Sequence, residues 1–398
     1  MSTVRARVWQ FRLERNIQVV ATVVGQGSLA VSLARLLHIN AMACDIRKVL
    51  DYRTRQLEVR LLLSYLGAAR SKALQLDHLA FAASSRHIRG FVSECSGLGV
   101  LTAAGEAIFA WKHGAHDLHN FDALPRQMLW QYDAKGVRPD LLFHLPTGPV
   151  AGEARGRYRR AKNILPKMPL STQKDRLREL ANWSAVHGDH SYFMSWLYIG
   201  PNGVAVDIFL PANPRWDTDL NTAAFEVDVE EQDDAQEWRF PLEEDLPTWQ
   251  RQRQPPAPRR SMPDNPDVPF LRDTMPSVAP GPPLPLDMLE DAAQEQAAMV
   301  IDELFRSAPE AGPDAALAGI PVRGTWAPAD QLGDARYEVL LGVLAAPAGT
   351  RVNVRERLAR AEGLFDVCLD GRLLTVVRPV TARRPEWTQL ERVVLAAR

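Results

Sequence analysis

The sequence predicts an α/β protein with a mixed-sheet core, preceded by a helical N-terminal region and followed by a small α+β domain. Three observations lead to this prediction. β-rich runs alternate with a helix-like stretch between residues 137 and 211, apolar residues recur at helical spacing before residue 92, and a proline-rich tract separates both regions from the last 110 residues. A chain of 398 residues is long enough for two or three domains.

The composition is that of a folded protein with an uneven charge distribution. Hydrophobic residues make up 46% and charged residues 24%, which excludes a wholly disordered chain. The formal net charge is −1, but residues 1–200 carry 27 basic and 15 acidic side chains, whereas residues 201–398 carry 20 and 33. The first half therefore carries a charge of about +12, which is compatible with a polyanionic ligand, although the net charge of the whole chain argues against one.

The cysteines and the most apolar N-terminal stretch bear on location. Cys44, Cys95 and Cys368 are scattered and odd in number, so we expect no disulfide framework and a reducing, cytoplasmic setting. The uncharged stretch from Asn16 to Ala34 contains several Gln, Gly and Ser residues, which make it too polar for a bilayer. We therefore expect no membrane association.

Residues 1–125 are predicted to be mostly helical, since 57–76 and 79–91 carry apolar residues at helical spacing. Within this region Gly25 and Gly27 fit a GxGxxA pattern between a β-branched run and a helix-like stretch, with Asp45 twenty residues beyond Gly25. Two interpretations are open: a nucleotide-binding turn, or a structural turn before a core helix. The second is favoured because no alternating strands follow.

Two short β-like runs place acidic residues near each other. The run 137–145 contains Asp140, and after a turn the run 150–158 contains Glu153, Arg155 and Arg157 at every second position. A period of two puts the last three side chains on one face of a strand. If the two runs pair as neighbours, Asp140 and Glu153 converge on one point.

Two converging carboxylates form a site that suits Mg²⁺, or Mn²⁺, with waters and a substrate phosphate as the other ligands. The metal ion would polarise the phosphate and activate a water for attack. Arg155, two residues beyond Glu153, would balance the charge that builds on the phosphate oxygens.

This pattern resembles the PD-(D/E)XK nuclease superfamily. Pro139-Asp140 matches the first element, and Glu153-Ala154-Arg155 matches the second, with Arg in the usual Lys position. The resemblance extends over residues 126–212, because a helix-like stretch from Ser171 and two further β-rich runs follow in the family's order of strands, helix and strand. It implies a restriction-endonuclease-like mixed-sheet core.

The resemblance also implies a function. A metal-dependent endonuclease of this family hydrolyses phosphodiester bonds, here with DNA as the expected nucleic-acid substrate and with a role in bacterial defence or genome maintenance. Asp140, Glu153 and the Ala154 carbonyl would bind Mg²⁺ or Mn²⁺. The alternative is a catalytically inactive nuclease-fold protein that acts as a nucleic-acid-binding or adaptor module.

Arg155 is the departure from the family pattern, because arginine stays charged and is a poor proton acceptor. Three interpretations are open. Arg155 substitutes electrostatically, or the lysine role has moved to Lys174 or, less favourably, Lys162, or the domain has lost cleavage and kept binding. The predicted catalytic set is therefore Asp140, Glu153, Arg155 and Lys174.

The residues after the motif predict a nucleic-acid interface. Arg157, Arg159, Arg160 and Lys162 form a basic cluster with few acids nearby. Such a cluster neutralises phosphates without reading sequence. A solvated basic face is the alternative.

Residues 213–285 are predicted to be an acidic and Pro-rich linker, since thirteen prolines fall between Pro241 and Pro285. Residues 286–398 are predicted to form a small α+β domain, with helices at 286–305, 329–344 and 352–361 and a hairpin around Asp370-Gly371. This order could form a winged-helix-like domain, or an interaction domain that binds a protein partner.

Overall fold

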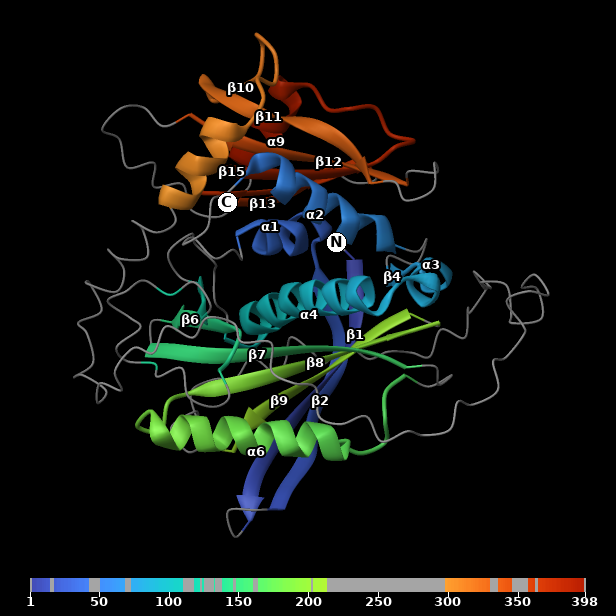
Figure 1. The fold of residues 1–398 in the computed structure, drawn as a ribbon, viewed down its shortest axis with the longest axis vertical. Helices are drawn as coiled ribbons and strands as arrows, with labels where there is room; N and C mark the ends of the chain where they lie inside the picture. The colour runs from blue at the N-terminus through green and yellow to red at the C-terminus, as the bar shows by residue number, and fades with distance from the viewer. Residues whose placement is uncertain are drawn as a thin grey trace, which may run out of the picture.

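The computed structural model shows a mixed α/β protein built on two large β-sheets (Figure 1). It describes residues 2–14, 18–42, 51–68, 73–109, 118–121, 124, 132, 138–145, 148–159, 164–201, 203–212, 298–329, 336–345, 357–361 and 364–396. The predicted linker at 213–285 lies outside these residues. The α/β class that the sequence predicts is confirmed.

The first sheet has seven strands in the order β2-β1-β9-β8-β7-β6-β5. These are β1 (Ser2–Glu14), β2 (Gln18–Val31), β5 (Leu118–Asn120), β6 (Leu141–Leu145), β7 (Gly148–Tyr158), β8 (Tyr192–Gly200) and β9 (Gly203–Pro211). The β7–β8 and β1–β9 pairs are parallel and the others are antiparallel. The predicted pairing of the two acid-bearing runs is confirmed by β6 and β7.

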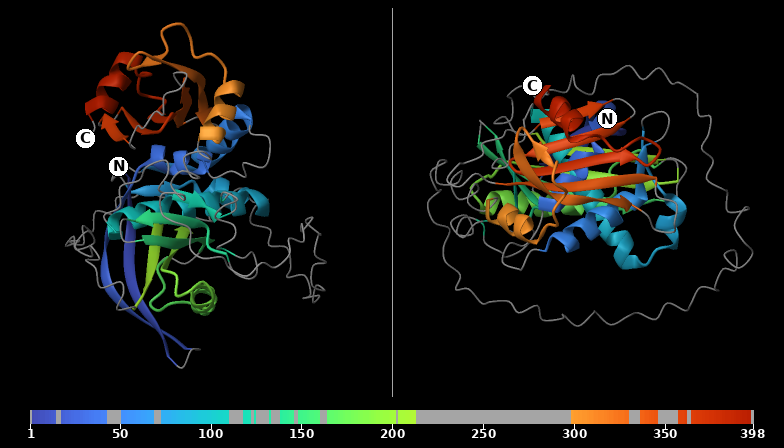
Figure 2. Two further views of the ribbon diagram at one scale, coloured as in Figure 1. Left: turned by 90° about the vertical axis from the view of Figure 1, so that its left-hand side faces the viewer. Right: turned by 90° about the horizontal axis from the view of Figure 1, so that it is seen from above.

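The N-terminal region contains helices, but it begins with a long antiparallel hairpin of β1 and β2 that the sequence analysis did not predict (Figure 2). β1 also pairs with β9, so the predicted boundary at residue 125 does not separate two sheets. Every second residue of β1 from Ser2 to Val8 is buried in the core shared with the helices, while Arg5 and Arg7 lie on the other face. This alternation is a strand pattern that the helical prediction overlooked.

Gly25 and Gly27 lie inside β2, opposite Val8 and Ala6. The following helix, α1 (Leu33–Met42), begins six residues beyond Gly27. A nucleotide-binding fingerprint needs its glycines at the turn between strand and helix. The nucleotide-binding interpretation is therefore wrong, and so is the structural-turn alternative; Asp45 lies outside the described residues.

Helices cover both faces of the seven-stranded sheet. One face packs against α4 (Arg86–Phe109), with α1 and α2 (Tyr52–Tyr65) beyond it, and the other packs against α6 (Ser171–Val186) (Figures 1 and 2). The predicted helix start at Ser171 is confirmed. Two short strands, β3 (Leu66–Ala68) and β4 (Leu74–Leu76), and α3 (His78–Ala83) connect α2 to α4.

The second sheet has six antiparallel strands in the order β10-β11-β12-β15-β14-β13. They are β10 (Ala316–Leu317), β11 (Ile320–Ala329), β12 (Tyr337–Leu344), β13 (Arg357–Ala361), β14 (Phe365–Asp370) and β15 (Leu373–Pro379), followed by α9 (Trp387–Ala396). Residues 298–307 are helical, within and just beyond the first predicted helix.

Two predictions for the C-terminal region are wrong. Segments 337–344 and 357–361, predicted as parts of helices, are strands, so the winged-helix-like arrangement is excluded. Both faces of β12 are buried, and its unbroken apolar run therefore lacks the alternation that marks a strand. The predicted hairpin is confirmed by β14 and β15.

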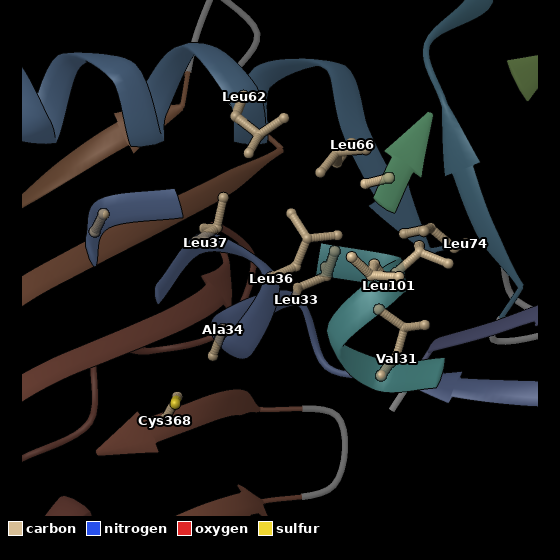
Figure 3. Close-up of a cluster of buried hydrophobic side chains, with 14 of the residues drawn as sticks. Val31, Leu33, Ala34, Leu36, Leu37, Leu62, Leu66, Leu74, Leu101 and Cys368 are labelled. Atoms are coloured by element: carbon tan, nitrogen blue, oxygen red, sulfur yellow. The ribbon is translucent and has the colours of Figure 1, made fainter. Parts of the chain in front are cut away.

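The two sheets share one hydrophobic core through α1 and α2. Side chains of α1 lie between α2, α4 and the strands of the second sheet, close to Cys368 (Figure 3). Tyr52 Oη donates to the Leu341 carbonyl at 2.5 Å and accepts from Thr325 N–H at 2.9 Å, and His38 Nδ1 lies 3.2 Å from Thr375 Oγ1. The C-terminal strands are therefore joined to the N-terminal helices.

No helix among the described residues is long and apolar enough to cross a membrane.

Candidate active site

Asp140, the residue just before β6, lies beside Glu153 in the middle of β7. Asp140 N–H donates to the Gly152 carbonyl at 3.0 Å, and Ala154 N–H donates to Asp140 Oδ2 at 2.7 Å. This pairing joins the residue just before β6 to the middle of β7. The structure therefore brings together the two carboxylates that the sequence predicts to converge.

β7 places Glu153, Arg155 and Arg157 on the face covered by α6, as its period of two predicts. Ala154 lies on the opposite face, where its side chain packs in the core under α4. Its carbonyl as a third metal ligand stays a prediction.

Two arginines hold one oxygen of Glu153. Arg155 Nη2 lies 2.5 Å from Glu153 Oε1, and Arg176 Nε and Nη2 lie 2.7 and 2.6 Å from the same oxygen. Glu153 is fully buried, and its Oε2 has no hydrogen-bond partner among the described residues. One carboxylate oxygen is therefore paired with two guanidiniums, while the other is buried and has no partner among the described residues.

The electrostatics of the acid pair disfavour two negative charges. Burial, and then the nearby Asp140 charge, raise the pKa of Glu153 to about 8, against the opposing effect of Arg155 and Arg176. Burial also raises the pKa of Asp140, opposed first by the Ala154 N–H bond and then by both guanidiniums. A buried carboxyl pair of this kind gains from an additional cation.

Sequence reasoning missed two residues of this site. Arg176 comes from α6, where its spacing from Leu177 and Leu180 places it on the helix face that meets the sheet. Helical periodicity could have identified it. Glu94 comes from α4, and its charge raises the pKa of Asp140.

The catalytic role predicted for Lys174 stays a prediction. This lysine lies on α6, half-buried, and makes no ion pair with Asp140 or Glu153 in the described part of the chain. The cation that α6 delivers to the acids is Arg176. Lys162, the second candidate, lies outside the described residues.

Part of the predicted nucleic-acid interface lies at the end of β7. The exposed Arg157 guanidinium stacks over the Trp196 ring at 5.8 Å, and that of Arg159 over the Tyr198 ring at 5.6 Å. Aromatic support fixes the orientation of an arginine while leaving its outer side open to a phosphate. Arg160 and Lys162 lie outside the described residues.

A buried network on the same sheet face supports the site. Asp207 on β9 accepts hydrogen bonds from Arg7, from Trp9 Nε1 at 2.9 Å and from Tyr198 Oη at 2.8 Å. Gln173 Nε2 of α6 donates to Tyr198 Oη at 2.6 Å. The network therefore fixes α6, and with it Arg176, relative to the three strands β1, β8 and β9.

The donor set fits a Mg²⁺ ion with few protein ligands. Among the described residues, no group of three or more His, Cys, Asp or Glu side chains could hold a metal. Mg²⁺ sites commonly use only one or two carboxylates, with waters and substrate phosphates completing the shell. Asp140 and the unpartnered Glu153 Oε2 meet that requirement.

Comparison of the chain with models of protein families, with curated proteins and with solved structures finds no match.

Proposed function

We propose that this protein is a metal-dependent nuclease that hydrolyses phosphodiester bonds of nucleic acid, with DNA as the expected substrate. The observation that carries the proposal is the buried pair of Asp140 and Glu153, with one free carboxylate oxygen beside two guanidiniums. The chain order β6, β7, α6 and β8 around this pair supports a restriction-endonuclease-like core.

Each residue of the site has a role in the proposed reaction. Asp140 and Glu153 would hold Mg²⁺ or Mn²⁺, which supplies Lewis-acid activation of the phosphate and of a water. Arg155 would stabilise the charge that develops on the phosphate oxygens, because a guanidinium presents fixed donors to an oxyanion. Arg157 and Arg159 would bind neighbouring phosphates.

Arginine changes the proton chemistry relative to a lysine at the same position. A guanidinium stays protonated at all physiological pH values and cannot accept a proton from water. The proposed site therefore uses Arg155 for charge stabilisation alone, which is the electrostatic interpretation of the sequence.

A second candidate function is nucleic-acid binding without cleavage, as an adaptor module. The observation that favours it is the double pairing of Glu153 with Arg155 and Arg176, which already compensates one carboxylate charge. The C-terminal sheet as a surface for a protein partner stays a prediction.

The deciding experiment is cleavage of plasmid DNA, linear DNA and RNA with Mg²⁺ or Mn²⁺. We expect Asp140→Asn and Glu153→Gln to lower the cleavage rate on the order of 100-fold or more. Asp175→Asn, an exposed acid on α6 that pairs with Arg178, is the matched control and should cleave normally. DNA binding with no cleavage by the wild type would support the adaptor function, and equal cleavage by all variants would exclude the proposed site.

A further inference from the structure

Arg176 pairs with one oxygen of the carboxylate whose other oxygen, Glu153 Oε2, is the proposed metal ligand. Its Nε and Nη2 both contact Glu153 Oε1, which Arg155 Nη2 also contacts. A positive charge at this distance competes with a divalent cation for the same carboxylate. The described arrangement therefore disfavours metal binding for as long as Arg176 stays in place.

The two arginines differ in how they are attached. Arg155 is two residues from Glu153 on the same strand, and its side chain is 30% exposed. Arg176 reaches Glu153 from α6, and its Nη1 lies 3.1 Å from Oε2 of Glu179, a residue that is half-exposed. The Arg176 side chain is 16% exposed and its second partner is 52% exposed, so this side chain is not sealed off from solvent.

We propose that Arg176 acts as a latch: its guanidinium pairs with Glu153 in the free protein and exchanges this partner for a phosphate when nucleic acid binds. This inference rests on the proposed function. Phosphate offers the bidentate geometry that a guanidinium favours. The exchange removes the Arg176 charge from Glu153, which can then bind the metal ion. Metal and nucleic acid therefore bind cooperatively, and each raises the affinity for the other by the same factor.

The first test measures metal binding to the free protein. Mn²⁺ is titrated into the full-length chain, and free Mn²⁺ is followed by electron paramagnetic resonance. We expect Arg176→Gln to raise Mn²⁺ affinity about tenfold, a typical size for such coupling. Arg178→Gln is the matched control, because Arg178 lies on the same helix but pairs with Asp175; its Mn²⁺ affinity should equal that of the wild type.

The second test uses the wild type and so does not depend on how a variant folds. Affinity for a fluorescently labelled 20-base-pair DNA duplex is measured by anisotropy with and without Ca²⁺, and gels check that the DNA stays intact. We expect Ca²⁺ to strengthen DNA binding about tenfold in the wild type. In Arg176→Gln the two ligands should bind independently.

The outcomes separate the latch from the proposed function. Equal Mn²⁺ affinity in wild type and Arg176→Gln, together with no effect of Ca²⁺ on DNA binding, overturns the latch and leaves the nuclease proposal standing. If no form of the protein binds Mn²⁺, with or without DNA, the proposed function fails, and the latch fails with it.

Discussion

Gly156 of β7 lies directly against the Ser93 carbonyl of α4, so that a Cβ at Gly156 would come within 2.0 Å of that oxygen. We expect Gly156→Ala to separate β7 from α4 and to destabilise the protein by about 1–3 kcal/mol, measured by urea unfolding. Since β7 carries Glu153 and Arg155, the proposed nuclease activity should fall as well.

The control for this prediction is Gly90→Ala in the same helix. Nothing lies within 4 Å of a Cβ at Gly90, and alanine favours the helix by about 0.5–1 kcal/mol. We expect Gly90→Ala to be neutral or stabilising. A Gly156→Ala protein as stable as the wild type would contradict the close approach of α4 and β7.

Asp207→Asn is expected to destabilise the protein strongly. The Asp207 side chain is fully buried and receives bonds from Arg7, Trp9 and Tyr198, so loss of its charge leaves the Arg7 guanidinium uncompensated. Breaking a buried pair in this way costs about 3–5 kcal/mol. Chemical denaturation should show this loss.

Glu14→Gln provides the comparison for Asp207→Asn. Glu14 pairs with Arg12 near the exposed end of β1, with side chains 46% and 67% exposed, and such pairs contribute at most about 1 kcal/mol. Similar losses in both variants would show that the Asp207 network does not stabilise the sheet.

Tyr52→Phe should weaken the joint between the two sheets. The Tyr52 hydroxyl bonds the Leu341 carbonyl and the Thr325 N–H, and its removal leaves both groups unpaired, at a cost of about 1–3 kcal/mol. Because the sheets share one core, we expect unfolding to remain a single transition in both proteins. Two separate transitions in the wild type would show that the sheets unfold independently.

His190 makes stability depend on pH. Burial lowers the pKa of His190 to about 4, against about 6.5 in an unfolded chain. The unfolded state therefore binds more protons between these values, and the stability that is present above pH 6.5 is lost as the pH falls to 4, by about 3 kcal/mol. Denaturation at stepped pH values measures this slope.

His190→Gln should flatten the slope over the same pH range. His87→Gln should not, because His87 is an exposed residue of α4. If wild type and His190→Gln lose stability in parallel between pH 6.5 and 4, the origin of the slope lies elsewhere.

The sequence predicts the part of the fold whose signals are local. The pairing of β6 with β7, the start of α6 at Ser171 and the hairpin at Asp370-Gly371 are all confirmed. β12 was missed because burial on both faces removes the period-two pattern, whereas β1 carries that pattern from Ser2 to Val8 and was overlooked.

The sequence predicts those residues of the candidate site that lie on β7 or next to its neighbour in the chain, β6. Asp140, Glu153 and Arg155 follow from the strand period and one local pairing. Arg176 depends on the rotation of α6 over the sheet, which packing against β8 decides. Residue type alone therefore pointed to Lys174, two positions away from the arginine that reaches Glu153.

The joint between the sheets also has a consequence for synthesis. α1 and α2 emerge early from the ribosome. The strands that cover the apolar sides of these helices, β12, β14 and β15, are synthesised near the end of the chain. Contacts between such distant segments form slowly. Until the final strands arrive, the nascent chain presents this apolar surface to its neighbours, and its production therefore carries a risk of aggregation that a chaperone would reduce.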